Sequence, residues 1–208
     1  MNIYLLRHGQ TDWNLEGRIQ GHTDIPLNPY GKLQIAQTAT DLAGICSNMD
    51  LILCSPLLRA RESARIVAEK LNYSEDRIIE EPLLIERCFG EAEGLTAAER
   101  EEKYPNYFYS DISYHFPGME SFEELIERAY NVFKTIVDTY KDKENILAVS
   151  HGAILAAIIT AVTEGRIEYF SDTISLDSGS LYRVRYEKEA VELSRYNNEE
   201  AVFRNISF

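Results

Sequence analysis

Three short runs of the chain are apolar throughout, and each ends in polar residues. They are IYLLR at 3–7, LILCS at 51–55 and NILAVS at 145–150. Continuous apolar runs of this length, without a polar residue at every second position, are typical of strands buried on both faces. The pattern therefore predicts a mainly parallel sheet with helices packed against both of its sides.

Helical periodicity and boundary residues occupy the segments between these strands. A helix is expected over 29–43, with Asn28 as its N-cap and Gly44 as its stop. Ser55 precedes a proline, which predicts the N-cap and first position of a second helix that ends near residue 71.

Capping boxes of the form S/T-x-x-E mark the start of two more helices, at Thr96 and at Ser121. The second of these should reach Tyr140. A wholly apolar helix, AILAAIITAV, should follow the strand at 145–150.

The remaining segments complete the expected fold. Residues 15–29 are predicted to form a loop, and 77–87 should contain one or two short extended segments around Pro82. SLYRVRY and AVELSRY predict a C-terminal hairpin. The chain of 208 residues has no internal repeat, linker or low-complexity tract. We therefore expect one α/β domain, spanning 1–208, with helices on both faces of the sheet.

The charge balance narrows the choice of partners. The chain has 34 acidic and 21 basic residues, a formal net charge of −13. Nucleic acids and anionic membranes attract proteins with a positive field, so both are disfavoured. The three cysteines are widely spaced, the N-terminus lacks the features of a signal peptide, and no apolar run reaches membrane-spanning length. We expect a cytoplasmic protein with reduced thiols.

Two predicted strands end in the same unusual way. RHG at 7–9 follows the first strand, and SHG at 150–152 ends the strand at 145–150. Ligands of open α/β sheets bind at the carboxyl ends of the strands, so His8 and His151 can face one another there. A single histidine at a strand end is usually a hydrogen-bonded structural residue. A pair, from four histidines in the chain, favours a functional site.

Arginine residues also follow the end of the predicted strand at 51–55. Arg59 lies about one helical turn after Ser55, and either Arg59 or Arg61 can face the crevice while the other is solvated. Guanidinium groups bind phosphoryl oxygens in a bidentate manner. Together with Arg7 and the two histidines, such an arginine predicts a phosphate site in an otherwise acidic protein.

The chemistry of such a site would need a nucleophile and an acid. A neutral imidazole can attack phosphorus and form a phosphohistidine. A protonated carboxyl group, kept neutral by burial or by nearby charge, must then protonate the leaving alkoxide. LLIERCFGEAEGLT offers Glu86, Glu91 and Glu93, of which Glu86 directly follows an apolar extended run.

These motifs resemble the histidine phosphatase superfamily, and most closely its cofactor-dependent phosphoglycerate mutase-like branch. The resemblance rests on RHGQTDWN at 7–14, CSPLLRA at 54–60, LIERCFGEAEG at 84–94 and VSHG at 149–152, in this order along most of the chain. GRIQGHTDIPLNPYGKLQ matches the segment after the first histidine. FPGMESF resembles a P-G-G-E-S segment in which Met119 replaces the second glycine.

The resemblance implies a role for each candidate residue. His8 would be the nucleophile, and Glu86 the general acid and then the base that activates water. Arg7, Arg59 and His151 would hold and neutralise the phosphoryl oxygens. Substrate-lining positions of relatives correspond to Asn14, Gln20, Gly21 and Gly152. Ser150 would either orient a neighbouring group or act only as a strand-end hydroxyl.

Neither a metal nor a cofactor is implied, and the sequence has no HExxH or similar spacing of metal ligands. Transfer of the phosphoryl group to water would make a phosphatase, and transfer to a second hydroxyl would make a 2,3-bisphosphoglycerate-dependent mutase. Thr11 in place of serine, the short stretch between Glu86 and His151, and the short C-terminal tail favour the phosphatase. A phospho-ligand binding module without turnover is the third possibility, and the complete set of candidate residues argues against it.

The substrate is expected to be a small phosphorylated metabolite. The family implies sugar phosphates, phosphoglycerates, phosphoserine or nucleotide-like monoesters such as α-ribazole phosphate. Six residues could form an apolar wall that favours a larger substrate: Trp13, Phe89, Tyr107, Phe108, Phe116 and Met119. The same residues could equally pack in the core or in a lid. Both a monomer and a homodimer remain compatible with the sequence.

Overall fold

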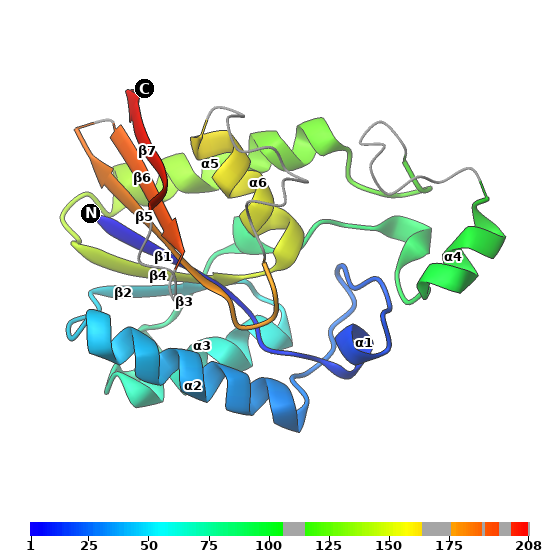
Figure 1. Cartoon of the computed structure of the whole chain (residues 1–208), viewed down its shortest axis with the longest axis horizontal. Helices are drawn as coiled ribbons and strands as arrows, with labels where there is room; N and C mark the ends of the chain where they lie inside the picture. The colour runs from blue at the N-terminus through cyan, green and yellow to red at the C-terminus, as the bar shows by residue number, and fades with distance from the viewer. Residues whose placement is uncertain (106–114, 164–175, 189, 196–200, 208) are drawn as a thin grey trace.

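A seven-stranded sheet with helices on both faces forms the centre of the computed structural model (Figure 1). The structure describes residues 1–105, 115–163, 176–188, 190–195 and 201–207. The strands lie in the order β3-β2-β4-β1-β5-β6-β7. Their bounds are β1 (Asn2–Arg7), β2 (Leu51–Cys54), β3 (Ile79–Glu80), β4 (Asn145–Ser150), β5 (Leu181–Glu187), β6 (Ala190–Arg195) and β7 (Ala201–Ser207).

Helices connect the parallel part of this sheet. The α-helices are α1 (Asp12–Leu15), α2 (Pro29–Ile45), α3 (Leu58–Lys70), α4 (Ala97–Lys103), α5 (Phe122–Thr139) and α6 (Gly152–Val162). Three short 3₁₀ turns are η1 (Glu75–Arg77), η2 (Pro82–Leu84) and η3 (Gly90–Ala92). Among the residues that the structure describes, no helix is both long and apolar enough to cross a membrane.

The expected α/β fold is confirmed, and the sheet is mixed. β3, β2, β4 and β1 are parallel, and β5, β6 and β7 continue the sheet antiparallel. Arg7 pairs with Ser150, and Cys54 pairs with Val149, so the carboxyl ends of β1, β4 and β2 meet at one edge. The predicted hairpin is β5–β6. β7 extends it by a strand that the sequence pattern did not predict.

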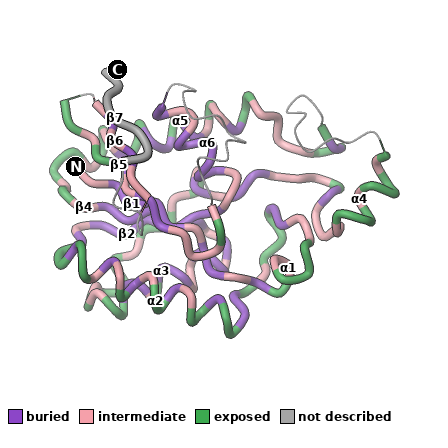
Figure 2. Tube along the Cα trace, viewed as in Figure 1, coloured by how far each residue is buried: buried purple, intermediate pink, exposed green. Residues whose placement is uncertain are grey.

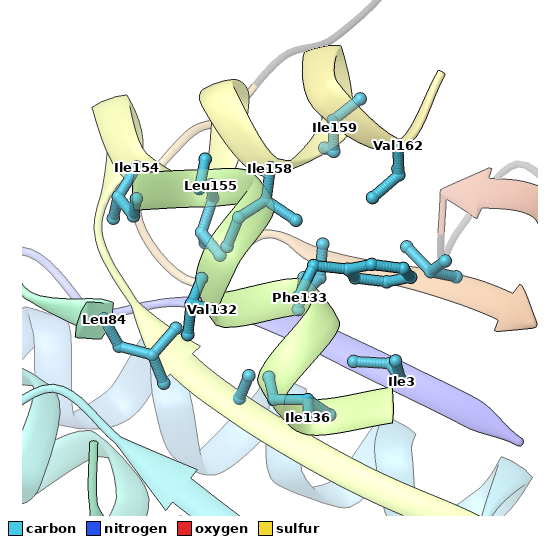
Figure 3. Close-up of a cluster of buried hydrophobic side chains, with 14 of the residues drawn as sticks. Ile3, Leu84, Val132, Phe133, Ile136, Ile154, Leu155, Ile158, Ile159 and Val162 are labelled. Carbon is cyan, nitrogen blue, oxygen red and sulfur yellow. The ribbon is translucent and has the colours of Figure 1, made fainter. Parts of the chain in front are cut away.

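The alternation of side chains along β1 explains why that strand is apolar throughout. Ile3 and Leu5 pack on the face covered by α5 and α6, whereas Tyr4 and Leu6 pack on the face covered by α2 and α3. Figure 3 shows the first of these layers, with side chains of α5 and α6 gathered around Ile3. The central strands are accordingly buried between two helical layers (Figure 2).

The capping boxes at Thr96 and Ser121 and the cap at Asn28 are confirmed. The predicted stop at Gly44 is wrong, because α2 continues to Ile45 and a Cβ at Gly44 would meet no atom within 4 Å. Pro82 opens the turn η2 after the short strand β3, in place of a second extended segment.

The predicted N-cap at Ser55 is also wrong. α3 begins two residues later than expected, at Leu58, and its N-cap residue Leu57 makes no side-chain hydrogen bond. The Oδ1 atom of Asp24 accepts a hydrogen bond from the Leu58 N–H (2.6 Å) and so caps the helix from another loop. The Ser55 Oγ atom accepts from the N–H of Leu57 (3.3 Å) and also contacts Nε2 of His151 (2.7 Å).

Candidate active site

Both candidate histidines are buried at the shared edge of β1, β2 and β4. His8 is 3% exposed and His151 is 0% exposed. The backbone N–H of His8 donates to the carbonyl of Ser150 (2.9 Å), which continues the pairing of β1 with β4. The two rings meet edge to face, with centroids 5.1 Å apart and planes at 60°. The structure therefore brings the two predicted histidines together.

The hydrogen bond of His8 determines which ring nitrogen is nucleophilic. Nδ1 lies 2.7 Å from the carbonyl oxygen of Gly9, and because a carbonyl only accepts, Nδ1 carries the proton. Nε2 is then the nitrogen with a lone pair. Burial, together with the charges of Arg59 and Arg7, holds the pKa of His8 well below its usual value. His8 is thus a neutral imidazole at neutral pH.

His151 has the opposite tautomer. The Nε atom of Arg59 donates to its Nδ1 atom (3.1 Å), so the proton of a neutral ring lies on Nε2. Nε2 lies 2.7 Å from the Oγ atom of Ser55. Burial and then the charge of Arg59 hold the pKa of His151 well below its usual value. Both nitrogens of His151 are therefore held by protein groups.

Arg59, rather than Arg61, faces the site. Arg59 is fully buried, and its Nη1 and Nη2 atoms donate to the carbonyls of Thr23 (3.0 Å) and Gly21 (2.7 Å). Arg61 instead forms an ion pair with Glu80 (3.5 Å). Burial lowers the pKa of Arg59 to about 10, with nearby carboxylates acting in the opposite direction. The guanidinium therefore remains charged at neutral pH, and one N–H on each terminal nitrogen is available for a phosphoryl oxygen.

Arg7 and Gly152 lie beside each other. A Cβ atom built on Gly152 would be 3.5 Å from the Cζ atom of Arg7. The Nη1 atom of Arg7 donates to the carbonyl of Leu176. Arg7, His8, Arg59 and His151 thus form one cluster of two cations and two neutral imidazoles, which suits a phosphoryl group.

Glu86 is the candidate acid that lies next to the histidines. It is 6% exposed, and its carboxylate lies at the N-terminus of α6, immediately after His151. Oε1 accepts from the N–H groups of Arg87 (2.8 Å) and Ile154 (3.2 Å), and Oε2 accepts from the N–H of Ala153 (3.2 Å). The burial of the Glu86 carboxyl group agrees with what the sequence predicts for the candidate acid. The three N–H donors use both carboxylate oxygens of Glu86 as acceptors and so fix its side chain at the start of α6.

The other two candidate acids have structural contacts. Glu91 is exposed and binds Lys103 and Tyr104. Glu93 accepts from the N–H of His22 (2.9 Å) and from the N–H (2.9 Å) and hydroxyl (2.7 Å) of Thr23. Burial raises the pKa of Glu93, but these hydrogen bonds outweigh burial and lower it. Glu93 therefore holds the loop whose carbonyls bind Arg59.

The predicted substrate-lining residues lie around that loop. Asn14 Oδ1 accepts from the backbone N–H of Thr11 (3.1 Å), and the amide of Gln20 also contacts the Thr11 hydroxyl (2.9 Å). A Cβ atom on Gly21 would lie 2.1 Å from Glu93 Oε1, so this close contact requires glycine. Asn14 and Gln20 are thus tied to the segment that follows His8, and Gly21 packs against Glu93.

The predicted apolar wall is only partly described. Phe89 and Met119 form an isolated antiparallel bridge, and buried Phe116 packs on Tyr104 with ring centroids 4.8 Å apart. Trp13 lies against Gly94. Tyr107 and Phe108 lie outside the described residues.

Sequence reasoning missed two serines that support the site, Ser55 and Ser63. Ser55 was interpreted as a helix cap. The Oγ atom of Ser63 accepts from the N–H of Gly9 (3.2 Å), and Ser63 lies one helical turn after Arg59 in α3. A Cβ atom on Gly9 would lie 2.4 Å from the carbonyl oxygen of Gly31, so the segment after β1 and the start of α2 touch through their backbones. The spacing between Arg59 and Ser63 was the one available signal.

Ser150 has a structural contact of its own. Its hydroxyl donates to the carbonyl of Leu84 (2.6 Å), which ties the end of β4 to the segment that leads to Glu86.

In the described part of the chain, no group of three or more His, Cys, Asp or Glu could hold a metal ion.

Comparison with known proteins agrees with this geometry. The model of the histidine phosphatase superfamily (branch 1) matches residues 3–199, and the chain belongs to this superfamily. It is 35% identical over 195 residues to an uncharacterized phosphatase, PhoE, of Bacillus subtilis, covering 94% of this chain and 93% of that protein.

Two other relatives are named for different reactions, one as a phosphatase and one as a mutase. A metal-independent phosphoserine phosphatase of Arabidopsis thaliana is 36% identical over 167 residues, covering 78% of this chain and 68% of that protein. A 2,3-bisphosphoglycerate-dependent phosphoglycerate mutase of Gloeobacter violaceus is 32% identical over 162 residues, covering 76% and 73%. Among solved structures, phosphoserine phosphatase from Entamoeba histolytica in complex with 3-phosphoglyceric acid is similar, with a TM-score of 0.78 at 26% identity, covering 95% of this chain and 98% of that one.

Proposed function

We propose that the protein is a metal-independent phosphomonoester hydrolase that works through a phosphohistidine on His8. The observation that carries this proposal is the tautomer of His8. Its Nδ1 proton is held by the Gly9 carbonyl, which leaves a neutral Nε2 beside two arginines. Membership of the superfamily and similarity to phosphatases support the same reading.

In the first step, Nε2 of His8 attacks phosphorus and the bond from phosphorus to the ester oxygen breaks. Arg7 and Arg59 stabilise the charge on the phosphoryl oxygens. His151 orients Arg59 through its Nδ1 atom, and a direct contact with the phosphoryl group would replace its bond to Ser55. The catalytic site thus provides electrostatic stabilisation without a metal.

Glu86 gives its proton to the departing alkoxide. A phosphoryl dianion beside the carboxylate favours proton uptake, because two like charges cannot both remain unprotonated at short range. Oε2 is the better proton carrier because it accepts one N–H bond, whereas Oε1 accepts two. In the second step Glu86 takes a proton from water, water attacks phosphorus, and the bond to His8 breaks to release inorganic phosphate.

The substrate class is a small phosphorylated metabolite. Names of relatives point to phosphoserine and to phosphoglycerates. Transfer to a second hydroxyl of a bound phosphoglycerate, as the name of the Gloeobacter relative describes, is the alternative function.

The test is phosphate release from a panel of phosphomonoesters in the presence of EDTA. The panel includes phosphoserine and 3-phosphoglycerate, with formation of 2-phosphoglycerate followed in parallel. We expect release without metal, and an acid-labile phosphoryl label on the wild type but not on His8→Ala. His115→Ala, a substitution at an exposed histidine, is the matched control. Interconversion of phosphoglycerates that requires 2,3-bisphosphoglycerate, without release, would establish the mutase, and binding without either reaction would establish a non-catalytic module.

A further inference from the structure

Arg128 of α5 uses all five of its N–H groups on one small part of the protein. Its Nε and Nη2 atoms donate to Oε1 and Oε2 of Glu120, each at 2.8 Å, in a bidentate ion pair. Nη1 donates to the carbonyls of Leu83 and Ile85, both at 2.8 Å. The second N–H of Nη2 reaches the carbonyl of Glu86 at 3.4 Å.

The three carbonyls belong to the segment that carries the candidate acid. They lie at and just before Glu86, so the guanidinium holds the backbone from which the catalytic carboxylate projects. The Glu86 carbonyl also accepts from Nε2 of His22 at 2.9 Å, which makes the contact from Arg128 the weaker of two at that oxygen. The contacts at Leu83 and Ile85 are therefore the main anchor.

Glu120 holds the same segment from its other end. Its carbonyl accepts from Nε of Arg87 (3.0 Å), and its N–H donates to the carbonyl of Cys88 (2.9 Å). The side chains of Arg128 and Glu120 are 15% and 16% exposed, so the ion pair is largely shielded from solvent. A shielded bidentate pair has one preferred geometry.

We propose that Arg128 and Glu120 are positioning residues for Glu86, and so for protonation of the leaving group. This inference rests on the proposed function. Proton transfer depends steeply on the position of the donor, since a displacement of about 1 Å can cost about a hundredfold in rate. Lysine has one point charge in place of the planar fork, so it cannot hold two carboxylate oxygens and two carbonyls together.

The test compares substrates whose leaving groups differ in their need for a proton. Arg128→Lys is assayed on an alkyl phosphate and on p-nitrophenyl phosphate, whose nitrophenolate leaves without protonation. We expect kcat on the alkyl phosphate to fall at least about tenfold more than kcat on p-nitrophenyl phosphate, with KM for both nearly unchanged. Glu120→Gln, which keeps the size of the side chain, should show the same selective loss. Should Arg128→Lys fail to fold, Glu120→Gln decides.

Three further variants separate this inference from the function on which it rests. Glu86→Gln should show the selective loss at full size, and adding Arg128→Lys to it should increase the selectivity no further. Arg65→Lys, at an exposed arginine paired with Glu75, is the control for the loss of a guanidinium. Equal losses on both substrates for Arg128→Lys and Glu120→Gln, with the selective loss in Glu86→Gln, would overturn the inference alone. Equal losses in Glu86→Gln would overturn the acid role of Glu86 and the inference with it.

Discussion

The Nε2 atom of His151 lies 2.7 Å from the Oγ atom of Ser55, and both residues are fully buried. The opposite nitrogen of the same ring accepts from Nε of Arg59. Arg59 can only donate, so it places the ring proton of His151 on Nε2, and Ser55 at the end of β2 accepts that proton. His151 in turn holds the candidate site arginine, Arg59, through the same hydrogen bond.

We predict that Ser55→Ala lowers both turnover and stability. The buried N–H of His151 would lose its acceptor, which costs about 1–3 kcal/mol of unfolding free energy. The ring would also lose the contact that orients its Nε2 side and would hold Arg59 less firmly, so kcat should fall about tenfold. Urea unfolding and phosphate release measure the two effects. Ser74→Ala, at an exposed position, is the control, and an unchanged kcat in Ser55→Ala would remove Ser55 from the site.

The tautomers can be observed directly. Nuclear magnetic resonance of the ring nitrogens at neutral pH should show His8 protonated on Nδ1 and His151 protonated on Nε2. Because burial and the two arginines lower the pKa of His8, its ring should stay neutral as the pH falls through 6.5. A His8 ring that is half protonated near pH 6.5 would contradict the proposed environment.

Stability should decrease as the solution becomes acidic. The pKa values of His8 and His151 in the fold lie well below the value of 6.5 expected for the unfolded chain. Below pH 6.5 the unfolded chain therefore binds more protons than the fold, and each histidine costs about 1.4 kcal/mol per pH unit until its folded pKa is reached. Urea unfolding between pH 7.5 and 5 measures the slope. In His151→Gln the slope should be smaller, and an identical slope would show that His151 protonates freely in the fold.

Glu93→Gln should weaken substrate binding. The carboxylate accepts two backbone N–H bonds and one hydroxyl bond from His22 and Thr23. In glutamine one of the two oxygens is replaced by an NH₂ group, which donates and cannot accept these bonds. The loop that holds Arg59 would loosen, so we expect KM to rise several-fold. Glu91→Gln, two residues away at an exposed position, is the matched control. Equal kinetics for the two variants would show that Glu93 has no role in positioning the loop.

The strand ends could be predicted from the sequence because local signals mark them. RHG and SHG each follow an apolar run, and parallel pairing of β1 with β4 brings the two histidines together. Ser55 could not be assigned in the same way. A serine before a proline is compatible with a helix cap, and its partner His151 is distant in the chain. Only the assembled sheet decides between these two uses of the hydroxyl.

The sequence favoured Glu86 over Glu91 and Glu93 because Glu86 follows an apolar extended run and matches the family motif, whereas its contacts depend on tertiary structure. All three lie in one short segment, and their local sequence does not show which carboxylate meets the N-terminus of α6. Likewise, β7 is defined by its pairing with β6, for which its own sequence gives a weak signal. Such assignments depend on contacts between distant segments.

The two helical layers contribute different parts of the site. Arg59 projects from α3 on one face of the sheet, whereas Glu86 is anchored to the first turn of α6 on the other face. The rate of turnover therefore depends on the packing of both helical layers against the sheet. A fluctuation that separates either layer from the sheet would switch the enzyme off while most of its secondary structure persists, so activity would be lost earlier than the helical signal on heating.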